Sequence, residues 1–267
     1  MLFDILIYAP ILGILAGVLS GLLGIGGGIV IVPALIYLLP ILDAIDDSNV
    51  ALVAIATSLF TIIVTTFSSA KSHYKKGNLD IAFTLPIIIA VAVTAFIAPY
   101  VATWLGGESL KILFAVLMML LAVNMTQSRH SSTEQDVPAS KVTLAFGGVL
   151  TGFLAAIAGL GGGAILVPYL SFIKVNIRKA IAAAAASGMV VAIFGTIGFM
   201  INGWYFSDDP DFIGFVHWPT AIGIMIFSYL SAPYGVKLGQ RLNQSQLKKV
   251  FALFMILVAV EMLIEQL

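Results

Sequence analysis

Two stretches of the chain share one pattern, Gly24-Ile-Gly-Gly-Gly-Ile-Val-Ile-Val-Pro33 and Gly159-Leu-Gly-Gly-Gly-Ala-Ile-Leu-Val-Pro168. They align residue by residue at an offset of 135, with four glycines, a valine and the proline identical. Three consecutive glycines weaken a helix because glycine loses more backbone freedom on ordering than any other residue. Each stretch therefore predicts a break between two helical segments, and the second break repeats the first.

The similarity extends beyond the glycines in both directions. Upstream, Gly13 and Gly17 align with Gly148 and Gly152 at the same offset of 135. Weaker matches follow in the same order along the chain, pairing Ala56-Thr57-Ser58 with Ala186-Ser187-Gly188 and Pro99-Tyr100 with Pro233-Tyr234. The sequence therefore predicts a tandem duplication, with a first repeat over 1–128, a polar linker over 129–140 and a second repeat over 141–267.

The composition places this duplication in a membrane. Of the 267 residues, 60% are hydrophobic and 10% are charged, and the mean hydropathy is +1.09. Soluble domains carry about a quarter charged residues, so a soluble enzyme is nearly excluded. The net charge of zero gives no reason to expect a nucleic-acid partner. Without cysteine and with only three histidines, the chain predicts no cofactor and no metal site.

The charged residues mark where the spans lie. Eight stretches contain no Asp, Glu, Lys or Arg, namely 5–42, 48–70, 81–107, 112–128, 142–173, 180–207, 212–236 and 250–260. About 20 apolar residues cross a bilayer, so each stretch predicts at least one membrane segment. The first stretch has no basic start and is longer than the apolar core of a signal peptide, so we expect it to be part of the protein.

Basic residues decide how the glycine-broken stretches cross. If 5–42 and 142–173 each cross once, the 13 Lys and Arg residues divide eight to five between the two sides. If each forms a hairpin that returns to the side it entered, the division is twelve to one. Lys and Arg concentrate in cytoplasmic loops, so the hairpin topology is favoured. It places both termini outside and the linker 129–140 inside.

The hairpin topology also makes the two repeats inverted. The loop 43–47 is then outside while its counterpart 174–179 is inside, and 71–79 is inside while 203–217 is outside. The predicted fold is an all-α polytopic membrane protein. It consists of two inverted repeats, each a glycine-broken hairpin plus three transmembrane helices, or about ten membrane segments.

Inverted repeats are a transporter architecture, with the substrate site near the bilayer midplane. The arms after the glycines, 29–42 and 164–173, reach about 21 and 15 Å against a hydrocarbon core of about 30 Å. The glycine tips should therefore end inside the membrane, where free N–H groups at a helix start favour an anion. The candidate substrate-binding glycines are Gly26, Gly27, Gly28, Gly161, Gly162 and Gly163. Close helix packing is the alternative explanation, and it is favoured for Gly13, Gly17, Gly148 and Gly152.

Hydroxyl side chains are the second candidate feature. Thr57, Thr61 and Thr65 recur at four-residue steps along 48–70, with Ser58 beside them. Thr57, Ser58 and the matching Ser187 are candidate substrate ligands. The alternative is that these hydroxyls bond carbonyls of their own helix.

These motifs resemble the sulfite exporter TauE/SafE family of membrane permeases, over nearly the whole chain. Ala56-Thr57-Ser58-Leu59 and His73 with Gly77-Asn78-Leu79-Asp80 also resemble that family. The resemblance implies a permease of the bacterial inner membrane for a small sulfur-containing anion such as sulfite or sulfoacetate. The chain departs from the pattern in its second half, where 201–217 is longer and acidic and Ser187-Gly188 replaces the Thr-Ser pair.

Several alternatives stay open at this point. An anion channel, or a permease of the same fold for another small carboxylate or sulfur compound, would use similar glycine tips. Lys71 is a candidate attractor for cytoplasmic anions, and His73, expected just beyond its helix, is a candidate gating residue. Lipid and a small anion are the expected partners, whereas coupling to protons or sodium and the oligomeric state are left open.

Overall fold

The computed structural model describes residues 2–23, 27–41, 45, 48–75, 77–127, 139–239 and 244–264. Nearly all of this part of the chain is helical. Its elements, in chain order, are α1 (Leu2–Leu23), α2 (Gly28–Ile41), α3 (Val50–Lys75), α4 (Ile81–Gln127), α5 (Lys141–Ile157), α6 (Gly163–Phe172), α7 (Ile177–Asn202), β1 (Phe212–Ile213), β2 (Val216–His217), α8 (Trp218–Gly239) and α9 (Gln244–Ile264).

Helix α4 is bent into two segments. Gly106 has φ 78° and ψ 163°, a conformation that a side chain would strain. The segments 81–105 and 107–127 run on either side of it. In the described part of the chain, three helices have the length and apolar character needed to cross a membrane, Val50–Lys75, the bent Ile81–Met125, and Ile177–Asn202. Large apolar side chains such as Leu120 (61% exposed) and Ile89 (57% exposed) face outward, which suits contact with lipid.

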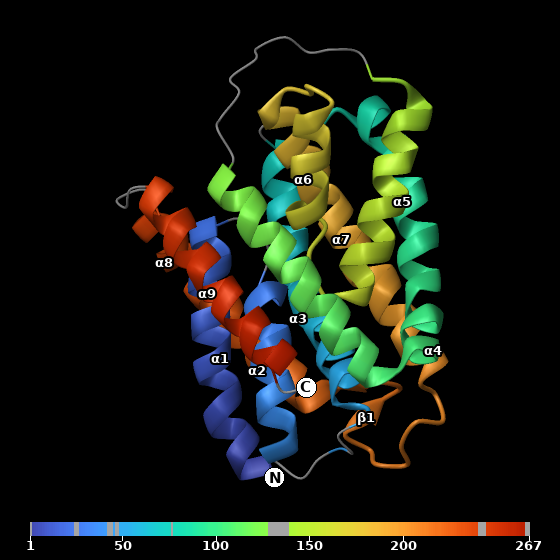
Figure 1. Ribbon diagram of the computed structural model, residues 1–267, viewed down its shortest axis with the longest axis vertical. Coiled ribbons are helices and arrows are strands. Elements are labelled where there is room, and N and C mark those ends of the chain that lie inside the picture. The colour runs from blue at the N-terminus through green and yellow to red at the C-terminus, as the bar shows by residue number, and fades with distance from the viewer. Residues whose placement is uncertain are drawn as a thin grey trace.

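The two glycine-broken hairpins enter the molecule from opposite ends (Figure 1). Helix α1 starts, and α2 finishes, at the end where both chain termini lie. Helix α5 starts, and α6 finishes, at the other end, close to the junction of α3 and α4. Helices α2 and α6 contain 14 and 10 residues, as expected for the short arms. Both hairpins therefore bring their glycines to the interior of the bundle.

One short element departs from the expected all-α fold. Strands β1 and β2 form an antiparallel two-stranded ribbon, with Phe212 opposite His217 and Ile213 opposite Val216. Gly214 in the turn has φ 59°, which suits a two-residue hairpin turn. A Cβ at Gly214 would also overlap Met200. This ribbon packs against the end of α7 and continues directly into α8.

Glycines join each hairpin to a helix of the other half. A Cβ added to Gly13 on α1 would lie 2.7 Å from Ile224 O of α8, and one added to Gly148 on α5 would lie 2.6 Å from Ile87 O of α4. Gly17 and Gly152 repeat the relationship one turn later, against Ser228 and Val91. Real Cβ atoms are not found that close, so these positions accept only glycine. The packing interpretation of these glycines agrees with the contacts.

Replacing Gly13 or Gly148 with valine should destabilise the protein by similar amounts, about 1–3 kcal/mol each, because both side chains would be forced into a facing backbone. Thermal unfolding in detergent measures the effect, and Ile14→Leu on the exposed face of α1 is the control. A valine variant as stable as that control would mean that the helices do not approach so closely.

Candidate functional site

The two glycine tips meet inside the bundle. A Cβ at Gly28, the first residue of α2, would overlap the carbonyl oxygen of Gly159. Gly159 has φ 66°, and a Cβ added there would lie 2.7 Å from Val32 Cγ2 of α2 and 3.1 Å from Ile55 Cα of α3. The carbonyl of Gly159 also accepts a hydrogen bond from Ser58 Oγ at 2.9 Å. Two hairpins from different halves of the chain are therefore joined to α3 at one point.

The second tip presents free backbone donors. Helix α6 begins without a side-chain cap at Gly162, and Gly161, Gly162 and Gly163 find no backbone acceptor for their N–H groups in the described part of the chain. Gly161 and Gly162 are buried. These three N–H groups and the α6 dipole form the type of helix start that binds anions.

Two residues with buried hydroxyl groups, Thr151 and Ser187, lie close to this helix start. An added Cβ at Gly162 would lie 3.2 Å from Thr151 Cγ2 and 3.1 Å from the N of Gly188, the residue after Ser187. Thr151 Oγ1 and Ser187 Oγ are fully buried and form no hydrogen bond with any described residue. Leaving such a group unsatisfied costs about 1–3 kcal/mol. The cluster therefore has spare donors that an anion would satisfy.

The hydroxyl side chains along α3 form two kinds of hydrogen bond, within the helix and to other segments. Thr61 and Thr65 donate to carbonyls of α3 itself, Thr57 O at 2.7 Å and Ile62 O at 3.0 Å. These two hydroxyls thus follow the alternative interpretation, in which they bond their own helix. Ser58 instead reaches Gly159, and Thr57 Oγ1 accepts the main-chain N–H of His217 at 3.1 Å. Among the described hydroxyl side chains of α3, only those of Thr57 and Ser58 hydrogen-bond to other segments.

Not every candidate lies at this cluster. Gly27 is buried beside Ala16 of α1, and Gly26 lies outside the described residues. Lys71 is exposed on α3, with Nζ 6.0 Å from the Phe67 ring centroid, and lies 13 residues beyond Ser58, or about 20 Å along the helix. The expectation that His73 follows the helix end is wrong, because α3 continues to Lys75.

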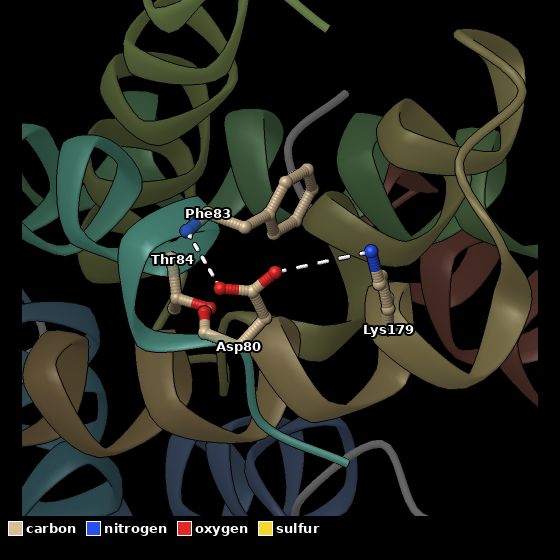
Figure 2. Close-up of polar contacts among 4 residues, drawn as sticks. All are labelled: Asp80, Phe83, Thr84 and Lys179. Carbon is tan, nitrogen blue, oxygen red and sulfur yellow. Dashed lines mark hydrogen bonds and ion pairs between the residues drawn. The ribbon is translucent and has the colours of Figure 1, made fainter. Parts of the chain in front are cut away.

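A polar cavity of about 410 Å³ opens at the end of the molecule remote from the termini. It is lined by Gly77, Asn78, Asp80, Asn176, Arg178 and Lys179, from the α3–α4 and α6–α7 connections. Asp80 caps α4 by accepting the Phe83 N–H at 3.1 Å, and its other oxygen is 3.8 Å from Lys179 Nζ (Figure 2). This ion pair links the two halves at the cavity wall.

His217 is the functional candidate that the sequence analysis missed. Its side chain is fully buried, Nδ1 is 2.8 Å from Thr220 Oγ1, and Nε2 has no partner among the residues described. The ring lies 4.8 Å from that of Phe212. A signal was present, since this histidine lies within the otherwise uncharged stretch 212–236.

Two opposing effects act on the pKa of His217, which lies in β2 outside the helices. Burial lowers the pKa because the imidazolium loses its hydration. The nearby Asp211 and Asp209 carboxylates raise it, but by less. The ring is therefore harder to protonate than a histidine in water.

These features define a membrane protein of the transporter class, and the comparisons identify its family. The family model described as Sulfite exporter TauE/SafE matches residues 9–262. The chain is 35% identical to a "Probable membrane transporter protein" of Haemophilus influenzae, and the match covers 99% of this chain and 100% of the relative. It is 28% identical to one of Methanocaldococcus jannaschii, covering 96% of this chain and 98% of the relative.

The chain belongs to the TauE/SafE sulfite exporter family. A third relative, "Probable membrane transporter protein YunE" of Bacillus subtilis, is 25% identical over 96% of both chains. No solved structure matches the chain. The expected family is confirmed, and the family is one of membrane transporters.

Without a bound anion, the thermal stability of the protein should fall as the pH decreases below about 6.5, the ordinary pKa of histidine. The reason is that unfolded His217 binds a proton more readily than folded His217 does. The loss should continue, with a limiting slope of about 1.4 kcal/mol per pH unit, until the pH reaches the lowered folded pKa.

His217→Gln should remove this component of the pH dependence, and His73→Gln should keep it. Melting curves recorded in detergent from pH 7.5 to 5.5 provide the measurement. Identical pH profiles for the wild type and His217→Gln would contradict the burial of a neutral imidazole.

Proposed function

We propose that this protein is a secondary transporter that carries a small sulfur-containing anion, such as sulfite or an organosulfonate like sulfoacetate, across the bacterial inner membrane. The observation that supports this most is the start of α6. There, within the part of the chain that the structure describes, three glycine N–H groups have no backbone acceptor, and the neighbouring residues Thr151 and Ser187 have buried hydroxyls without a hydrogen-bond partner. Family membership supports the transport of a small solute.

The chemistry of the cluster suits an oxyanion. A sulfite or sulfonate group presents three oxygens, each of which accepts hydrogen bonds from N–H or O–H donors. Backbone donors at a helix start bind such a group without a buried Lys or Arg, and residues 142–173 and 180–207 contain neither. The equivalent start of α2, at Gly27 and Gly28, would provide a related set of donors when the tips separate.

We infer that the halves are inverted repeats of about ten membrane segments. Two observations support this. The hairpins enter from opposite ends (Figure 1), and the glycine contacts repeat atom by atom. Gly13 faces Ile224 O and Phe227 Cβ, while Gly148 faces Ile87 O and Ala90 Cβ, at a constant offset of 137 between the facing residues. Counting α4 as two segments at Gly106 gives five per half.

The basic end of the molecule is proposed to be cytoplasmic, together with the linker 129–140. The end of α3, the start of α5 and the α6–α7 connection all lie opposite the chain termini (Figure 1). These segments carry Lys71, Lys75, Lys141, Lys174, Arg178 and Lys179. By the positive-inside rule both termini are then periplasmic. The 410 Å³ cavity with Arg178 and Lys179 would be the cytoplasmic mouth.

The contact between the tips supports a carrier rather than an open channel. Gly28 lies directly against Gly159 and Leu160, so the described conformation is closed at the crossing point. An anion must separate the tips to pass, as alternating access requires. Saturable uptake and counterflow would support the carrier, and steady unsaturable flux would support a channel.

Substitutions in the α6 cluster test the anion site. Ser187→Ala and Thr151→Val should each weaken anion binding by about 5- to 10-fold. This is the effect of losing one hydrogen bond of about 1–1.5 kcal/mol. Gly162→Val should abolish transport, because its Cβ would meet Gly188. Thr65→Val, whose hydroxyl bonds its own helix, is the matched control. Thermal shifts and uptake with sulfite, sulfoacetate, taurine and sulfate provide the readout and identify the preferred anion. Unchanged affinity in both hydroxyl variants would exclude this site.

The topology has a separate test. A reporter fused after Asp209 should be active outside the cell, and one fused after Lys76 should be active in the cytoplasm, because the intervening helices form an odd number of crossings. Alkaline phosphatase and green fluorescent protein fusions report the two sides. Both fusions on one side would rule out the inverted arrangement.

A further inference from the structure

His217 occupies a place where a buried ionisable side chain has no evident structural role. The ring is fully buried, and only Nδ1 is engaged, with Thr220 Oγ1 at 2.8 Å. Nε2 is left without a partner in the described structure. If Nδ1 carries the hydrogen, Nε2 is a bare acceptor for a proton. If Nε2 carries it, the group is a buried donor without an acceptor. In either tautomer, Nε2 is the ring atom at which a proton or a hydrogen-bond acceptor would bind.

The position of His217 connects it to the crossing of the hairpins. Its main-chain N–H donates to Thr57 Oγ1 at 3.1 Å. The next residue, Ser58, donates to Gly159 O at 2.9 Å. Strand β2 is thus attached to the same turn of α3 that holds the second glycine tip. A change of charge on the ring acts on the segment that must move when the tips separate.

Among the described residues, the charges that act on the ring come from one side only. Asp209 and Asp211, in the connection before β1, are the charged groups that act on it. The elements packed around it contribute none, because residues 48–70 of α3, 180–202 of α7 and 218–236 of α8 contain no Asp, Glu, Lys or Arg. The connection between α7 and β1, which carries both aspartates, lies at the end where the chain termini lie (Figure 1).

An anion at the glycine tips would add to the negative charge that Asp209 and Asp211 already place near the ring. A proton on His217 favours an anion nearby, and an anion nearby favours the proton, since linkage between two bound ligands is reciprocal. The absence of Asp, Glu, Lys and Arg from these segments makes His217 the natural partner for a bound anion.

We propose that His217 is the proton-binding residue that couples proton movement to anion transport, so that one proton crosses with each anion. This inference rests on the proposed function as an anion carrier. It assigns the proton as the coupling ion and excludes sodium coupling.

Proteoliposomes test the coupling with sulfoacetate, whose charge is constant between pH 6 and 8. With the membrane potential clamped at zero, a gradient of one pH unit should concentrate labelled sulfoacetate about tenfold in wild-type vesicles. His217→Gln should retain counterflow but show no pH-driven accumulation. His130→Gln, in the linker 129–140, is the matched control and should accumulate like the wild type. Equal accumulation by His217→Gln would overturn the proposal.

A measurement on the wild type alone covers the case in which His217→Gln fails to fold. Adding sulfoacetate to the weakly buffered, detergent-solubilised protein should withdraw about one proton per chain from solution. Counterflow without proton uptake would overturn the coupling and leave the carrier function intact. The absence of counterflow with both sulfoacetate and sulfite would contradict the proposed function itself.

Discussion

Close backbone contact between opposite halves is the interaction on which the rest of the structure depends. Gly13 and Gly17 bring α1 against α8, and Gly148 and Gly152 bring α5 against α4. In a membrane, helices gain little from hydrophobic exclusion, and small residues allow the van der Waals contact that holds them together. Because the first arm of each hairpin is fixed by the other half, its glycine tip is held in the interior, where the two tips meet.

The meeting of the tips links the fold to function. Gly28 contacts Gly159, and Ser58 bonds the Gly159 carbonyl. Irregular backbone at membrane depth is tolerated only where protein or a cavity surrounds it, and here α3 and the opposite hairpin surround it. The unpartnered Thr151 and Ser187 lie just beyond, at the start of α6. Family membership fits a carrier in which this contact opens and closes.

Much of this fold could be predicted because its determinants are local or repeated. The glycine runs, the short arms and the segregated charges are visible as patterns, and they led to the helix breaks and the family. The division of α4 was also predicted, because Glu108 and Lys111 separate the charge-free stretches 81–107 and 112–128. Gly106 itself was not singled out as the residue at the bend. The end of α3 was also misjudged, because His73 and Lys75 are compatible with both a helix end and a loop.

The candidate site was predicted only in part, for a different physical reason. Thr57, Ser58 and Ser187 were identified because the repeat relates them. Thr151 was missed because its place beside Gly162 depends on how the second hairpin folds, and His217 was missed because its partner lies far away in the chain. The hydrogen bond between His217 and Thr57 joins residues 160 positions apart, and the ribbon that carries His217 has no counterpart in the first half.

The exchange of partners between halves also has a consequence for biogenesis. Helix α1 leaves the ribosome first, but its packing partner α8 is synthesised more than 200 residues later. During that interval the glycine face of α1 is exposed to lipid or to insertion factors, and α2 is too short to span the bilayer. Expression of the first half alone would therefore yield a chain whose hairpin has no docking helix, which makes it a substrate for quality-control proteases.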